Sequence, residues 1–261
     1  MTNSPNNIFL SPSYLSLRTA RLETFQTSAE IESTSSKFKY LSIRTLTRTI
    51  GSPGAITALF TYRHSSDPSQ VQESDLEIRT SDPESLIHYT NQPSLTKDGE
   101  VESRATRNST LPNGLKWSDW LIHRLDWTPE YTAWYVNDIL VAQISFQVPR
   151  DESNIILNAW SDGGEWTGNM SVGGQAELQV KWIEIVYNST EAEGGKIKMT
   201  SKAKKEKNEG GICGAVCGID GTGVEEVGKP VLLWDNGGGE RIRGSWGLLW
   251  VAVGLSVVLL A

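Results

Sequence analysis

Residues 39–49 read KYLSIRTLTRT, a segment in which apolar and polar side chains alternate. This alternation is typical of a half-buried β-strand, because successive side chains of a strand point to opposite faces. Further strands are predicted at 55–62, 74–80, 85–90, 120–127, 154–160 and 177–187, and residues 131–143 predict a hairpin that turns at Asn137-Asp138. No segment keeps a helical period over about ten residues. The sequence therefore predicts an all-β fold, an antiparallel β-sandwich.

Length and charge limit the classes of protein that remain. The chain has 261 residues, 38% hydrophobic and 21% charged, which is enough for one sizeable core with tails. Its net charge of −7 argues against binding nucleic acid through phosphates. Two Cys are too few for a cysteine-built zinc or iron–sulfur site, and the three His are scattered. The sequence predicts no metal, no cofactor and no nucleic-acid partner.

Composition divides the chain into four parts. Residues 1–35 are rich in Ser, Thr and Asn and are predicted to be irregular, and 36–190 contain the predicted strands. Residues 191–235 are rich in Gly, Lys and Glu and predict a disordered linker. Cys213 and Cys217 lie in that linker, where they form either a small local disulfide or two free thiols. Residues 236–261 contain a hydrophobic C-terminal tail.

The tail has the pattern of a signal for glycosylphosphatidylinositol (GPI) attachment. Residues 246–261 carry no charge, and small residues and a short polar spacer precede them, with Asn236 as the expected attachment residue. A tail-anchored helix is the alternative. Three Asn-x-Ser/Thr sequons, at Asn108, Asn169 and Asn188, fit a secreted chain held at the cell surface or cell wall by a lipid anchor in the plasma membrane. Residues 1–22 lack a secretory signal, so we expect the natural start to lie upstream.

Glu73-Ser74-Asp75-Leu76-Glu77 is the candidate site. On a strand, its three acidic side chains share one face, and their mutual repulsion should raise at least one pKa. Such an asymmetry suits glycoside hydrolysis, which needs one ionised and one protonated carboxyl group. The Cα atoms of the two glutamates would be roughly 13 Å apart, whereas a retaining pair needs carboxyl groups about 5–5.5 Å apart. The side chains must therefore lean inward, or the strand must bend. An acidic edge strand that prevents aggregation is the alternative.

These residues resemble glycoside hydrolase family sixteen, with its concanavalin A-like lectin/glucanase fold, and are similar to its fungal GPI-anchored cell-wall members. The family's E-x-D-x-E strand matches residues 73–77. Its later blocks match Trp120-Leu-Ile-His123, Asp126-Trp127-Thr128-Pro129, the aromatic hairpin at 134–136, and Asn158-Ala-Trp160-Ser-Asp-Gly-Gly-Glu-Trp166-Thr-Gly168. The resemblance covers roughly 36–190 and implies a β-jelly roll whose concave face holds a glycan.

The resemblance also implies roles for individual residues. Glu73 would be the nucleophile of a retaining mechanism, Glu77 the general acid and base, and Asp75 the residue that tunes the pair. Aromatic rings suit the apolar faces of sugars, and the candidate substrate-binding residues are Trp160, Trp166, Trp120, His123 and Trp117. We expect a monomer that hydrolyses β-glucan. Transglycosylation and non-catalytic carbohydrate binding on the same sandwich are the alternatives.

Overall fold

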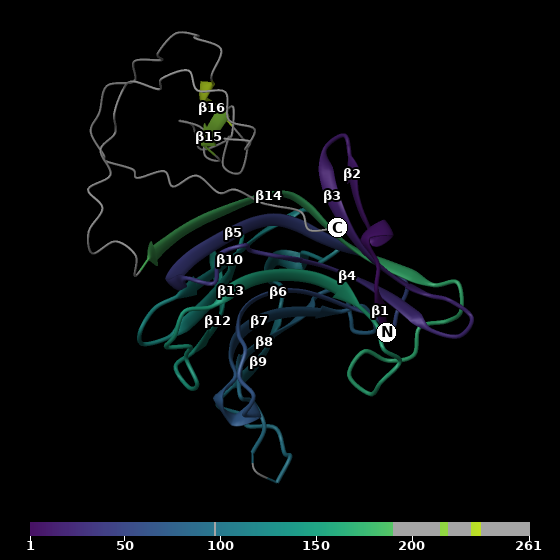
Figure 1. The fold of residues 1–261 in the computed structure, drawn as a ribbon, viewed down its shortest axis with the longest axis horizontal. Coiled ribbons are helices and arrows are strands. Elements are labelled where there is room, and N and C mark those ends of the chain that lie inside the picture. The colour runs from purple at the N-terminus through teal and green to yellow at the C-terminus, as the bar shows by residue number, and fades with distance from the viewer. Residues whose placement is uncertain (97, 190–214, 219–230, 236–261) are drawn as a thin grey trace. The chain divides into compact units, whose positions relative to one another are not determined.

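The computed structural model describes residues 1–96, 98–189, 215–218 and 231–235 (Figure 1). The chain divides into two units. The first contains Met1–Asn188. The second contains the short strands β15 (Ala215–Gly218) and β16 (Val231–Asp235), which pair antiparallel.

The first unit is a β-sandwich made by one path of hydrogen-bonded strands that folds into two layers. The outer layer has the order β12-β11-β10-β5-β14-β3, and the inner layer has the order β4-β13-β6-β7-β8-β9. The inner layer is bent, and the outer layer is stacked on its convex side (Figure 1). The free, concave side of the inner layer is called the concave face below. The all-β sandwich fold predicted from the sequence is confirmed.

The bounds of the strands follow the chain. They are β1 (Thr2–Asn3), β2 (Ile8–Ser11), β3 (Tyr14–Arg21), β4 (Gln26–Glu32), β5 (Phe38–Gly51), β6 (Ile56–Arg63), β7 (Gln72–Arg79), β8 (Leu86–Gln92), β9 (Thr106–Thr110), β10 (Leu121–Trp127), β11 (Thr132–Val136), β12 (Ile139–Ile144), β13 (Asn154–Trp160) and β14 (Gln175–Ser189). Three 3-10 turns, η1 (Pro5–Asn7), η2 (Pro68–Gln70) and η3 (Pro112–Gly114), complete the elements.

The core lies between the two layers and follows the alternation seen in the sequence. On β5 the odd-numbered side chains from Leu41 to Thr49 are buried, and the even-numbered ones are partly exposed. Trp127, Trp134 and Tyr89 are among the largest fully buried side chains. Burying an apolar side chain of this kind stabilises the fold by about 1.5–3 kcal/mol. The core therefore fixes which side chains of β7 are left to face outward.

Every strand predicted from 39 onward is present, and the hairpin turns where expected. Asn137 and Asp138 have φ angles of 47° and 64°, which suit the left-handed turn that joins two twisted antiparallel strands. The sequence missed β9, which is polar throughout (TRNST), and also β15 and β16, which lie in residues predicted to be a disordered linker. No α-helix occurs in the part of the chain that the structure describes.

Residues 1–35 are not irregular, and this prediction was wrong. They form β1 to β4, and β4 pairs with β13 along the inner layer, so the sandwich begins before residue 36. The signal was weak because the buried positions hold small or polar residues, such as Ser16, Thr19, Ser28 and Ala29. Their burial comes from neighbouring strands that are distant in sequence, which local periodicity does not reveal.

The predictions for the C-terminal region fall mostly outside the described residues. Cys213, most of the linker and Asn236 lie there, and Cys217 is described only as part of β15. Over the described ranges, no helix has the length and apolar character that crossing a membrane requires.

Candidate active site

Strand β7 places three carboxylic side chains on the concave face. Ser74, Leu76 and Ile78 point into the core and are buried, so Glu73, Asp75 and Glu77 project from the opposite side. The strand is central in the inner layer, between β6 and β8. The three acids therefore share one face, as their spacing predicted, and the strand is not an acidic edge strand.

A polar network fixes the register of β7 from behind. Ser74 Oγ donates a hydrogen bond of 2.8 Å to Asn91 Oδ1, and Thr132 Oγ1 donates one of the same length to the same oxygen. The Asn91 amide in turn donates to the carbonyl oxygen of Phe146 at 3.0 Å. Ser74 is thus a satisfied polar residue in the core, and a slip of β7 by one residue would break this network.

Cross-strand pairs set what surrounds each acid. Glu77 lies opposite Ala58 on β6 and His88 on β8, and the same row continues to Asn158 on β13 and Asn108 on β9. Ala58 is the smallest residue of this row. Glu73 lies opposite Tyr62 and Gln92.

Burial raises the pKa of all three acids. The pKa of Glu73 rises to about 7 through burial, and the charge of Glu77 adds to the rise. Burial also raises the pKa of Asp75 well above its usual value, and the charges of Glu73 and Glu77 raise it further. A hydrogen bond between Asp75 and Glu73 lowers the pKa of Glu73 and raises that of Asp75. Within this pair, the interaction favours the proton on Asp75 rather than on Glu73.

Glu77 has a different environment. Burial raises its pKa, and a hydrogen bond from Trp166 opposes the rise, followed by electrostatic interactions with His88 and Arg79. Acid-assisted displacement at an acetal carbon requires one ionised carboxylate and one protonated carboxyl group, and three neighbouring acids with raised pKa values can supply such a pair. The described part of the chain shows no cluster of His, Cys, Asp or Glu that could hold a metal ion.

A hollow of about 280 Å³ lies over strands β4 and β13 of the same layer. Its lining includes Trp160, Asn158 and Glu30. The Asn158 amide donates to Glu30 Oε2 at 3.3 Å, and its buried Oδ1 has no hydrogen-bond partner among the described residues. An aromatic ring with free polar groups beside it is suited to a sugar, which presents both apolar C–H faces and hydroxyl groups.

Residues 1–184 match the family model described as glycosyl hydrolases family 16. The chain belongs to this family. The family 16 match also includes residues 1–35, in agreement with the strands found there.

Three known proteins show how far the similarity to family 16 relatives extends. The chain is 23% identical over 139 residues to a β-glucanase of Paenibacillus macerans, covering 52% of this chain and 54% of that protein. A prokaryotic β-1,3-1,4-glucanase (lichenase) from a mouse hindgut metagenome superposes with a TM-score of 0.58 at 22% identity, covering 69% of this chain and 83% of that one. The laminarinase catalytic domain of Thermotoga maritima gives 0.58 at 18% identity, with 71% and 82% coverage. The chain spans about half the length of the P. macerans relative, and the structural likeness shows a shared fold.

Two of the five predicted substrate-binding residues lie at the concave face of this family 16 domain. Trp160 lines the hollow, and Trp166 contacts Glu77 and is 42% exposed. Trp166 lies in the loop between β13 and β14.

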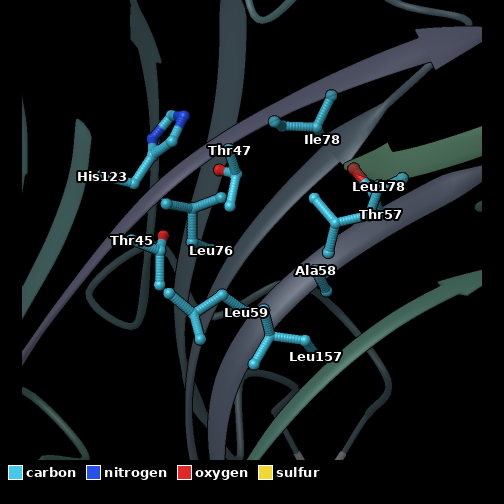
Figure 2. Close-up of a pocket in the computed structure, with 10 residues that line it drawn as sticks. All are labelled: Thr45, Thr47, Thr57, Ala58, Leu59, Leu76, Ile78, His123, Leu157 and Leu178. Carbon is cyan, nitrogen blue, oxygen red and sulfur yellow. The ribbon is translucent and has the colours of Figure 1, made fainter. Parts of the chain in front are cut away.

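His123 does not reach the concave face, so its prediction as a substrate contact was wrong. It is 2% exposed and lies on β10 between the layers, where it lines a small internal cavity with Thr45, Leu76 and Leu59 (Figure 2). Neither ring nitrogen has a hydrogen-bond partner in the described residues. Burial lowers its pKa to about 4, so the ring is neutral and packs as core.

The predictions of Trp117 and Trp120 as substrate-binding residues were also wrong. Trp117 is 4% exposed, packs in the core cluster, and donates its ring N–H to the Pro83 carbonyl oxygen at 3.2 Å. The ring of Trp120 lies against Arg48 and Lys181, 4.7 and 4.4 Å from its centroid, on the outer layer. The strand that carries the predicted Trp/His pattern belongs to the layer opposite the acids, which spacing alone does not show.

Several residues at the concave face were not among the predicted site residues. Arg79 follows Glu77 by two positions, and the alternation of β7 could have placed it on the same face. No local sequence pattern indicates Asn158 and Glu30, because their position at the face depends on pairing between β13 and β4.

Of the predicted glycosylation sites, Asn108 and Asn169 are exposed, and Asn108 also bonds His88 at 2.9 Å. Asn188 lies in β14.

Proposed function

We propose that this protein is a retaining glycosidase that hydrolyses O-glycosyl bonds of β-glucan. The observation that carries the proposal is the alternation of β7, which places the carboxylic side chains of Glu73, Asp75 and Glu77 together on the concave face. Family membership and the similarity to bacterial β-glucanases support the same substrate class.

In the proposed mechanism, the Glu73 carboxylate attacks the anomeric carbon and forms a covalent glycosyl-enzyme. Glu77 transfers its proton to the leaving glycosidic oxygen as the C–O bond breaks. Glu77, now ionised, takes a proton from water, whose oxygen attacks the anomeric carbon and releases Glu73. Two inversions give net retention. The hydrogen bond from Asp75 lowers the pKa of Glu73 and so favours the ionised form that attacks.

The proposal is tested by incubating purified protein with laminarin and with mixed-linkage β-glucan and measuring released reducing ends. Glu73→Gln should abolish the activity, whereas Glu130→Gln, a matched change at an exposed loop residue, should leave it unchanged. NMR of the first product should show the β-anomer. Binding without turnover would contradict the proposal, and products longer than the substrate would assign transglycosylation instead.

We further propose that the protein acts as a monomer at the cell surface or in the cell wall, held to the plasma membrane by a lipid anchor, as in the fungal members that it resembles. Support comes from the composition of residues 236–261 and from the exposed sequons at Asn108 and Asn169. In cells that express the full sequence, phosphatidylinositol-specific phospholipase C should release protein that ends at Asn236 from the membranes, and Asn236→Leu should abolish anchoring. Protein that stays membrane-bound after this treatment would support a tail-anchored helix.

A further inference from the structure

The side chain of Trp166 is held by Arg79 and His88 at the position where it meets Glu77. The Arg79 guanidinium carbon is 4.5 Å from the centroid of the Trp166 ring. The His88 ring meets Trp166 edge-on, with centroids 5.2 Å apart and an interplanar angle of 69°. The only donor of the indole ring is Nε1–H, and Glu77 receives its hydrogen bond.

Asp82 connects Arg79 and His88 behind Trp166. His88 Nε2 is 2.6 Å from Asp82 Oδ2, and Arg79 Nε is 3.7 Å from the same oxygen. The other His88 nitrogen, Nδ1, is 2.9 Å from Asn108 Oδ1. Arg79, Asp82 and His88 come from β7, the β7–β8 loop and β8, so three consecutive segments fix one loop tryptophan.

We propose that Arg79 and His88 are positioning residues that hold the Trp166 indole N–H against Glu77, with Asp82 holding both of them. The inference deepens the proposed function, because it rests on Glu77 acting as the general acid. Trp166 lies in a long loop, and a loop side chain with 42% exposure would otherwise sample several rotamers. The cation–π contact with Arg79 and the edge contact with His88 restrict it to one.

The same residues oppose the effect of burial on the acid. The titratable or charged groups on the same strand as Glu77 are Glu73, Asp75 and Arg79. On the neighbouring strand β8 there is His88, with Asp82 behind it, and β6 contributes the uncharged Ala58. Burial raises the pKa of Glu77, while Trp166, His88 and Arg79 lower it. An acid that must give up a proton and regain one within each turnover works best when its pKa stays near the working pH.

Arg79 is the residue to change, because an arginine keeps its charge at all accessible pH values. Arg79→Met removes the charge and the cation–π contact. We expect the alkaline limb of the kcat profile to move up by about one pH unit and kcat at the optimum to fall about tenfold, with KM changed less than twofold. Arg79→Lys restores the charge and should return the limb to within about 0.3 unit of the wild-type position. Arg124→Met is the matched control, because it removes an arginine 3.8 Å from the Tyr135 ring on the outer layer.

A second readout does not depend on activity. In protein with ¹⁵N-labelled tryptophan, the Trp166 indole resonance, assigned with Trp166→Phe, should titrate with Glu77 and lose that titration in Glu77→Gln. Its midpoint should rise in Arg79→Met and stay unchanged in Arg124→Met. If wild-type protein cleaves no glucan but the midpoint moves, the proposed function fails and the positioning role stands. An unmoved midpoint, or an unmoved alkaline limb in an active Arg79→Met variant, would overturn the inference.

Discussion

Replacing Glu73 with glutamine should stabilise the protein at alkaline pH and leave its stability unchanged at acidic pH. The pKa of Glu73 rises from its usual 4.5 to about 7, chiefly because the side chain is buried. Between these values, the folded protein binds a proton that the unfolded chain has released. The stability that this proton contributes is therefore fully present below pH 4.5 and is lost as the pH rises through about 7.

The size of the effect follows from that rise. At about 1.4 kcal/mol for each pKa unit, a change from 4.5 to about 7 amounts to about 3 kcal/mol. The glutamine side chain would resemble the protonated acid in shape and charge, so the Glu73→Gln variant avoids this loss. At pH 8 the midpoint of thermal unfolding should be roughly 5–10 °C higher than in the wild type, and at pH 4.5 the two should coincide.

Urea unfolding followed by tryptophan fluorescence at the two pH values measures the difference directly. Glu130→Gln serves as the control. Because Glu130 is exposed, this variant should have the stability of the wild type at both pH values. If Glu73→Gln changes the stability by the same amount at pH 4.5 and at pH 8, the reasoning is refuted. Such a result would show that ionisation of Glu73 does not destabilise the folded state.

Three further changes test other parts of the structure. His123→Leu should reduce the loss of stability at acidic pH. Burial lowers the pKa of His123 to about 4, so the wild type loses stability as the pH falls from about 6.5 through 4. If the midpoint of thermal unfolding depends on pH in the same way in both proteins, the prediction is contradicted. Trp160→Ala should raise KM for glucan about threefold to tenfold, whereas Trp120→Ala should not, and steady-state kinetics on one substrate compares them. Asn91→Ala should cost about 2–3 kcal/mol in urea unfolding, because Ser74 and the Phe146 carbonyl group lose their partner; a cost under about 0.5 kcal/mol would show that water replaces it.

Sequence reasoning succeeded where a residue's place depends on its nearest neighbours in the chain. The alternation of residues 39–49 predicted β5, and the spacing of Glu73, Asp75 and Glu77 placed three acids on one face. It failed for residues 1–35, whose buried positions are mostly small or polar, and for β9, which has no apolar alternation. In both cases, burial comes from strands that pair over long distances in sequence.

The same division applies to the candidate site. The chain by itself determined that β7 carries three carboxylates with a period of two, because a strand imposes this period on any sequence. Only the tertiary structure decided which layer each aromatic residue joins. It placed Trp166 against Glu77, and it placed His123 in the core and Trp120 on the outer layer. The pairing order of the strands sets those positions, and that order is fixed by packing of the whole sandwich, which no local pattern of residues records.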